Sequence, residues 1–161
     1  MRRRFPAQDP DALAAVLRLI NLGRGVTGTI TPHFAKIDLT EARFTLVMMI
    51  YRMEWQFGSA TPSQLAQHAG IGKAAMTQML DGLAETGWID RNPHPEDRRK
   101  LTIRLTPSGK RRLERFLPEH FARMGRLTAA LSAADLESLN ALMDKLEDGL
   151  AGIDSVKPAR G

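Results

Sequence analysis

The sequence contains no cysteine among its 161 residues. Disulfide bonds, thiolate metal sites and thiol-based redox sensing are therefore excluded. Long apolar runs are also missing, because the longest, "FTLVMMIY" from Phe44 to Tyr51, is far shorter than the ~20 residues of a membrane-spanning helix. The N-terminal residues lack the apolar core of a signal peptide. We therefore expect a soluble cytoplasmic protein with no membrane partner.

Catalytic and metal-binding motifs are missing as well. The sequence has no H-E-x-x-H, no Walker loop and no G-x-S-x-G, and its four histidines are widely separated (His33, His68, His94, His120). One cluster, His94 with Glu96 and Asp97, has metal-ligating residue types, but its Pro-rich surroundings favour a turn. The sequence predicts neither an enzyme nor a cofactor or metal site.

Positive charge is abundant but confined to one segment. The formal net charge is +5, and between Arg91 and Arg115 nine Lys or Arg residues face three acids. The rest of the chain is therefore close to neutral. Such a segment indicates either a polyanionic partner or a solvated surface.

Most of the chain has helical periodicity. A first helix is predicted to begin near Asp9 and Pro10 and to bend or end at Pro32, with four apolar residues at helical spacing (Leu13, Val16, Leu17, Ile20). A second is predicted from Thr40 to about Trp55. It is apolar on nearly every side, which is typical of a helix buried in the centre of a protein.

A helix-turn-helix follows. The stretch "TPSQ" places Thr61 as the N-cap, Pro62 at the first helical position and Gln64 at the capping-box position. Gly70 should end this short helix, and the next should run from about Lys73 to Gly87.

The helix after Lys73 has two unlike faces. Its apolar stripe contains Met76, Met79, Leu80 and Leu83. The opposite stripe suits a DNA major groove, because it offers a cation, a small residue, a hydroxyl and an amide able to bind adenine (Lys73, Ala74, Thr77, Gln78). Ser63 and Gln64 complete the contacts predicted on the two helices. The alternative is an ordinary solvated helix face.

A β-hairpin is predicted directly after Gly87. Its first strand is "WIDRN", and its second, within "PEDRRKLTIRLTPSG", should place Leu101, Ile103 and Leu105 on one side and Thr102 and Arg104 on the other. Helix-turn-helix followed by a hairpin describes a winged helix. The predicted fold class is thus mainly α with a small β-hairpin wing.

The tip of the hairpin is strongly charged. We expect Asp97 to hold the Arg99 guanidinium by charge-assisted hydrogen bonds, so that Arg99 is oriented to enter an A·T-rich minor groove. Arg98 and Lys100 would then contact phosphates.

These residues resemble the MarR family of bacterial transcriptional regulators. The family's wing pattern, D-x-R, five residues, then L-T-x-x-G, is matched without a gap by Asp97, Arg99, Leu105, Thr106 and Gly109. The run "LAQHAGIGKAAMTQMLDGLAETGWIDR" also looks like the family's helix-turn-helix, and the resemblance covers roughly residues 10 to 150. Gly72 and Ala74 depart from it, since the family often has hydroxyl residues there.

The resemblance implies a homodimeric regulator, most often a repressor, on double-stranded DNA with a pseudo-palindromic operator. The expected regions are an arm and dimerisation helix at 1–39, a winged helix-turn-helix lobe at 40–106, C-terminal dimerisation helices at 107–150 and a frayed tail at 151–161. A helix from Pro107 should bend near Pro118, and Ser132 should cap the last helix. The alternative function is a winged helix that makes protein contacts without binding DNA.

The family also implies a pocket for a small aromatic or phenolic acid. Phe44, Met48 and Tyr51 share one stripe of the second predicted helix, and His33 lies shortly before it. These four residues are the predicted ligand site. The alternative for each of them is plain core packing.

Overall fold

The computed structural model describes residues 9–93 and 101–155, and it is mainly α-helical with one two-stranded antiparallel hairpin, as predicted. The chain divides into two compact units, Met1–Leu117 and Pro118–Gly161. The boundary lies within a helix, α5 (Pro107–Leu127). None of the helices in the described part of the chain combines the length and apolar character needed to cross a membrane.

Helix α1 (Pro10–Phe34) begins where the sequence predicts. The Asp9 carboxylate accepts hydrogen bonds from the backbone N–H groups of Asp11 (2.9 Å) and Ala12 (3.3 Å), and Pro10 takes the first helical position. Pro32 lies inside the last turn, and the helix ends two residues later in the short 3₁₀ helix η1 (Ala35–Ile37). Proline therefore marks the end of α1 without stopping it at once.

Helix α2 (Glu41–Phe57) is the centre of the first unit. The Thr40 hydroxyl accepts from the Arg43 N–H (3.3 Å), and Gly58 ends the helix in the left-handed region at φ 78°. Its buried side chains lie on more than one side of the helix (Phe44, Leu46, Val47, Ile50, Met53). The prediction of a central buried helix is confirmed for most of its length, although Trp55 and Phe57 at its end are exposed.

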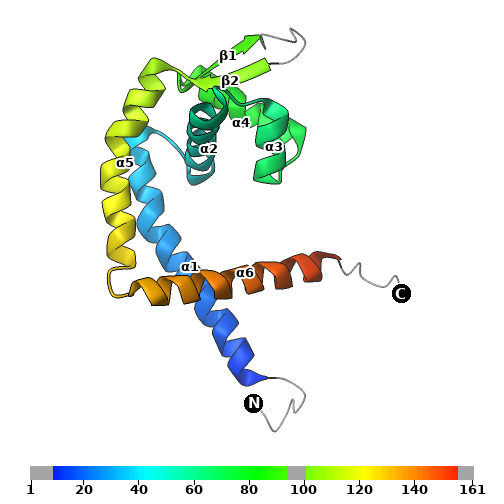
Figure 1. The fold of residues 1–161 in the computed structure, drawn as a ribbon, viewed down its shortest axis with the longest axis vertical. Helices are drawn as coiled ribbons and strands as arrows, with labels where there is room; N and C mark the ends of the chain where they lie inside the picture. Colours follow the sequence, from blue (N-terminus) through cyan, green and yellow to red (C-terminus); the bar gives the residue numbers. More distant parts are fainter. Residues whose placement is uncertain (1–8, 94–100, 156–161) are drawn as a thin grey trace. The chain divides into compact units, whose positions relative to one another are not determined.

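The helix-turn-helix consists of α3 (Pro62–Ala69) and α4 (Lys73–Glu85), which gather with α2 and the hairpin in one lobe (Figure 1). Thr61 and Gln64 form the predicted capping box, with the Thr61 N–H donating to Gln64 Oε1 at 3.0 Å. Gly70 (φ 63°) and Gly87 (φ 70°) adopt left-handed conformations after the two helices.

The hairpin pairs β1 (Ile89–Pro93) with β2 (Leu101–Leu105). Ala60 adds a bridge on the other side of β2, exchanging backbone hydrogen bonds with Ile103 (3.1 and 2.7 Å). The burial of β2 does not alternate with its sides, because Thr102 is buried and Leu101 is exposed. Burial of Thr102 is tolerated since its hydroxyl donates to the Asn92 carbonyl of the partner strand (3.1 Å).

Two residues of the L-T-x-x-G pattern join the hairpin to α5. The Thr106 hydroxyl donates to the Gly87 carbonyl (2.7 Å) and accepts from the Gly109 N–H (2.8 Å), so that it caps α5 and holds the turn before β1. A Cβ at Gly109 would overlap the Trp88 carbonyl oxygen. The pattern is therefore explained by a close backbone approach.

In the second unit, α6 (Ala133–Ser155) begins with the predicted cap. The Ser132 hydroxyl donates to the Asp135 carboxylate (2.7 Å), and the Asp135 N–H donates back to the Ser132 hydroxyl (3.2 Å). The hydrogen bonds from Ser132 hold the pKa of Asp135 below its usual range. Helix α6 continues to Ser155, three residues beyond Gly152, where the sequence predicts the tail to begin.

Candidate nucleic-acid interface

Helix α4 has the two faces that its sequence predicts. Met76, Leu80 and Leu83 are buried against the lobe, whereas the polar stripe is exposed along its whole length (Lys73, Ala74, Thr77, Gln78). The Thr77 hydroxyl donates to the Lys73 carbonyl (2.9 Å), and its lone pairs remain available to a donor. The stripe is thus free to meet a partner.

The start of α4 adds polar backbone to this face. Its N-cap is Gly72, which has no side chain to accept from the first N–H groups of the helix. Such a helix start attracts phosphate oxygens, and Lys73 supplies a cation beside it.

The two predicted contacts on α3 differ from each other. Ser63 is exposed near the helix start. Gln64 is also exposed, but its Oε1 accepts from both the backbone N–H and the hydroxyl of Thr61 (3.0 and 2.8 Å). Gln64 therefore stabilises the helix start in this structure, and a contact with DNA would have to use its amide N–H groups.

The predicted wing residues Asp97, Arg98, Arg99 and Lys100 lie outside the described residues. The strands that lead to them are described, and Pro93 pairs with Leu101 at the last rung of the hairpin. Arg104 on β2 is exposed.

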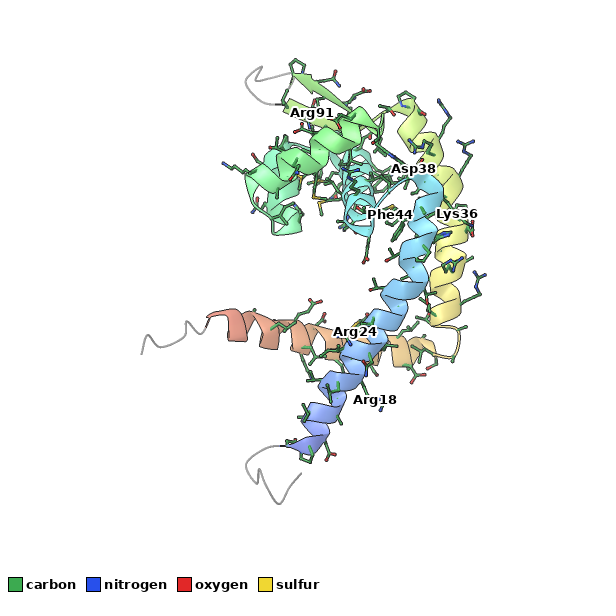
Figure 2. All side chains as sticks on the ribbon, turned by 180° about the vertical axis from the view of Figure 1, so that it is seen from behind. Arg18, Arg24, Lys36, Asp38, Phe44 and Arg91 are labelled. Atoms are coloured by element: carbon green, nitrogen blue, oxygen red, sulfur yellow. The ribbon has the colours of Figure 1, made fainter. Side chains whose placement is uncertain are left out.

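An ion pair joins the hairpin to α4. Arg91 Nη2 lies 2.6 Å from Asp81 Oδ1, and the two side chains are 29% and 50% exposed. Figure 2 shows Arg91 on the hairpin beside the helix. The sequence does not indicate this pair, because the partners lie on different elements and share no periodic pattern. The pair fixes the first strand of the wing relative to the predicted recognition helix.

A second arginine of the basic segment also serves the fold. Arg112 of α5 donates to the carbonyl oxygens of Ile37 (3.0 Å) and Thr86 (3.4 Å), and its guanidinium lies 4.2 Å from the centre of the Trp88 ring. Its Nη2 is also 3.7 Å from an Asp38 carboxylate oxygen. Part of the positive charge of the basic segment is therefore used in contacts within the protein and is not available to bind a polyanion.

Similarity to known proteins shows the family to which this chain belongs. A model described as the MarR family matches residues 39–101. The HTH-type transcriptional repressor YetL of Bacillus subtilis (strain 168) is 35% identical over 116 residues, which are 72% of this chain and 68% of YetL. The chain belongs to the MarR family. It is a DNA-binding transcription regulator of that family and not an enzyme.

Three further comparisons extend over more of the chain. The HTH-type transcriptional regulator PecS of Dickeya dadantii (strain 3937) is 25% identical over 149 residues, 92% of this chain and 89% of PecS. A mutant MarR from E. coli complexed with operator DNA matches with a TM-score of 0.71 at 25% identity, covering 86% of this chain and 99% of that one. AbsC of Streptomyces coelicolor has a TM-score of 0.79 at 19% identity, over 90% of this chain and 97% of AbsC, which shows the fold.

Of the four predicted ligand residues of this MarR-family chain, one lines the smaller of the two cavities described below and none lines the larger. His33 and Phe44 are buried in an aromatic cluster that joins α1, α2 and α5, where the His33 and Phe116 ring centres are 4.4 Å apart and those of Phe34 and Phe44 are 4.6 Å apart. The surroundings of these two residues therefore agree with the alternative interpretation, plain core packing.

Met48 and Tyr51 are half-buried. The Tyr51 hydroxyl donates to Glu114 Oε1 (3.2 Å), and Lys110 Nζ lies 5.7 Å from the ring centre. Burial, and then the hydrogen bond and negative charge of Glu114, raise the pKa of Tyr51 above its ordinary value. Met48 lines a cavity of about 600 Å³ at the end of α2, together with Arg52 and Phe57.

A larger cavity of about 730 Å³ lies between the end of α1, the start of α2, α3 and α4. None of the four predicted residues lines it. Its apolar lining comes mainly from Leu46, Met49, Ile71, Met76 and Met79, and its polar lining from Thr31, Thr40, Glu41, Thr45 and His68. Because the lining residues come from four helices, periodicity within a single helix could not predict this cavity. Within residues 9–93 and 101–155, no three His, Asp or Glu side chains gather where they could hold a metal ion.

Proposed function

We propose that this chain is a homodimeric repressor that binds a pseudo-palindromic operator and is released by a small aromatic or phenolic ligand. The observation that carries the DNA-binding part is the exposed polar stripe of α4 opposite its buried apolar stripe. Lys73 and the uncapped helix start would contact phosphates, while Thr77 and Gln78 would reach base edges in a major groove. The wing residues Asp97 to Lys100 would extend the contact into a minor groove.

Exposed apolar faces support the homodimer. On α1, Leu13, Val16, Leu17 and Ile20 lie on one stripe, and each is 44% or more exposed. On α6, a second exposed set repeats at helical spacing (Leu139, Leu142, Met143, Leu146, Leu150). Contiguous exposed apolar stripes mark interfaces, and a second copy of the same chain would cover both. We propose the arm and dimerisation helix at 1–39, the winged helix-turn-helix lobe at 40–106, the C-terminal dimerisation helices at 107–150 and the tail at 151–161.

Repression is proposed from the relatives. YetL and an E. coli MprA, which is 33% identical over 103 residues, carry the names of transcriptional repressors. A dimer bound across a promoter would block it by occupancy alone. A ligand that favours a lobe position incompatible with DNA would release it.

Selection of bound fragments from the organism's own genomic DNA tests this function. Purified protein should retain fragments that share two inverted half-sites about 10 base pairs apart, and fluorescence anisotropy should give affinities that fall steeply with salt. Retention of no fragment at low salt would favour the alternative, a winged helix that makes protein contacts alone.

A further inference from the structure

The cavity between α2, α3 and α4 has an apolar lining that comes from α2 and from the turn and second helix of the helix-turn-helix. Leu46 and Met49 come from α2, Ile71 from the turn, and Met76 and Met79 from α4. Its volume of about 730 Å³ falls in the range of small-molecule sites. Three of these five lining residues are methionine, and methionine side chains adapt to ligands of different shape.

The charge of the lining is one-sided. Glu41 is the single acid among the lining residues, and no Lys or Arg belongs to that set. Arg43, the next cation along α2, lies against Gly82 of α4 and does not line the cavity. Within the described part of the chain, no cation forms an ion pair with the Glu41 carboxylate.

His68 adds a second acceptor. Its Nδ1 is 2.9 Å from the Gln64 carbonyl oxygen, and because a carbonyl only accepts, Nδ1 carries the hydrogen in this contact. In the tautomer with the hydrogen on Nδ1, Nε2 is an acceptor. Glu41 and His68 together favour a ligand that donates hydrogen bonds and carries positive charge.

We propose that this cavity binds an apolar organic cation, such as a protonated aromatic amine, with Glu41 as its counter-ion. A carboxylic acid of the same size would meet the Glu41 carboxylate and no cation. This site narrows the ligand of the proposed function from any small aromatic or phenolic compound to an aromatic amine.

The same cavity connects to the DNA-binding face through α4. Met76 and Met79 lie on the inner side of this helix, and their neighbours Thr77 and Gln78 lie on the outer side. A ligand that enters between Met49 and Met79 changes the distance between α4 and α2, and hence the position of the outer stripe. This effect on DNA rests on the proposed function, whereas binding of the cation does not.

The test uses three probes with one ring system and different charge: naphthylmethylamine, naphthylmethanol and naphthoic acid. Isothermal titration calorimetry on the full chain without DNA should show the amine binding most tightly and the acid most weakly. Glu41→Gln should weaken amine binding by about 3- to 10-fold, the loss expected for an exposed charge-assisted contact, and leave the alcohol unchanged. Glu85→Gln, the same change at an exposed residue of α4 that does not line the cavity, is the control and should alter neither.

A second measurement follows the effect on DNA. The amine should weaken binding of the selected operator by about 5- to 150-fold, and the operator should weaken amine binding by the same factor. Binding of the acid at least as tightly as the amine, or an amine affinity unchanged in a folded Glu41→Gln protein, would overturn the cation site. So would the absence of binding by all three probes. Amine binding with the expected Glu41 dependence but no operator binding would instead contradict the proposed function and leave the cation site standing.

Discussion

Thr106 and Gly109 illustrate how a pattern residue can be structural without touching a partner. Thr106 serves the chain at two points at once, as the cap of α5 and as a donor to the Gly87 carbonyl. Gly109 lies so close to the Trp88 carbonyl that a Cβ has no room. The side chain of the same Trp88 is buried, and the Arg112 guanidinium lies over its ring.

Gly109→Ala should therefore destabilise the protein. Because the obstacle is a backbone carbonyl and not the end of a flexible side chain, the free energy of unfolding should fall by about 1–3 kcal/mol. Urea denaturation followed by circular dichroism measures it. Gly125→Ala, in the same helix with open space at the Cβ position, is the control and should be neutral or slightly stabilising. Equal effects of the two changes would show that the close approach at Gly109 does not exist.

Gln78 and Lys73 should contribute differently to operator binding. If Gln78 binds an adenine edge, Gln78→Ala should cost about 1–3 kcal/mol on the operator and relax preference at one position of each half-site. Lys73→Ala should weaken binding to all sequences and reduce its salt dependence. Competition binding with single-base operator variants measures both. A uniform loss for Gln78→Ala on operator and scrambled DNA would assign Gln78 to backbone contact only.

The secondary-structure elements of this chain follow mostly from local chemistry. Thr40, Thr61 and Ser132 each satisfy N–H groups within three residues, so their helix starts could be predicted without the fold. The two faces of α4 follow in the same way from the 3.6-residue period.

Contacts between distant elements could not be predicted in this way. Arg112 donates to carbonyls 75 and 26 residues away. The burial of Thr102 depends on the carbonyl of the opposite strand. The large cavity combines residues of four helices, whereas the predicted ligand site used residues of α2 with His33, and two of these became core.

The contact between β1 and α4 gives a prediction in which two effects have opposite signs. Removing the Asp81 carboxylate near a DNA-binding face should tighten operator binding by simple electrostatics. Loss of its ion pair with Arg91 frees the hairpin from α4 and should weaken binding instead. We expect Asp81→Asn to weaken operator affinity about 3- to 10-fold, while the free energy of unfolding changes by less than about 1 kcal/mol.

Glu85→Gln is the matched control for Asp81→Asn. Glu85 is an exposed acid on the same helix, and no residue of the described chain forms an ion pair with it. This change should show the electrostatic effect alone and tighten binding slightly. If Asp81→Asn also tightens binding, the ion pair does not position the wing. Anisotropy titrations at two salt concentrations separate the two cases.

At the level of the whole chain, the basic segment and the exposed apolar stripes belong to different elements. The basic segment begins at Arg91 on the hairpin and runs into the first half of α5, whereas the exposed apolar stripes lie on α1 and α6. A dimer through the apolar stripes would leave the two basic lobes free for DNA. Each lobe alone would bind one half-site weakly, so dimer formation should control operator affinity.

Leu17→Glu tests this dependence. Leu17 is 52% exposed in the centre of the α1 stripe, and burial of such a side chain contributes about 1.5–3 kcal/mol per copy, twice in a two-fold symmetric interface. The dimer dissociation constant should rise by roughly two to four orders of magnitude, as measured by sedimentation velocity. Affinity for the complete operator should fall with it, while weak binding to a single half-site should persist.

The same substitution at Leu22 separates interface loss from the added charge. Leu22 lies on the side of α1 away from the Leu13 to Ile20 stripe, is 65% exposed, and would carry the same new carboxylate on the same helix. Leu22→Glu should remain dimeric and keep its operator affinity within about 2-fold, because the change lies outside the proposed interface. If instead Leu17→Glu stays dimeric and Leu22→Glu dissociates, the copies meet through the opposite side of α1, and the apolar stripe has another partner.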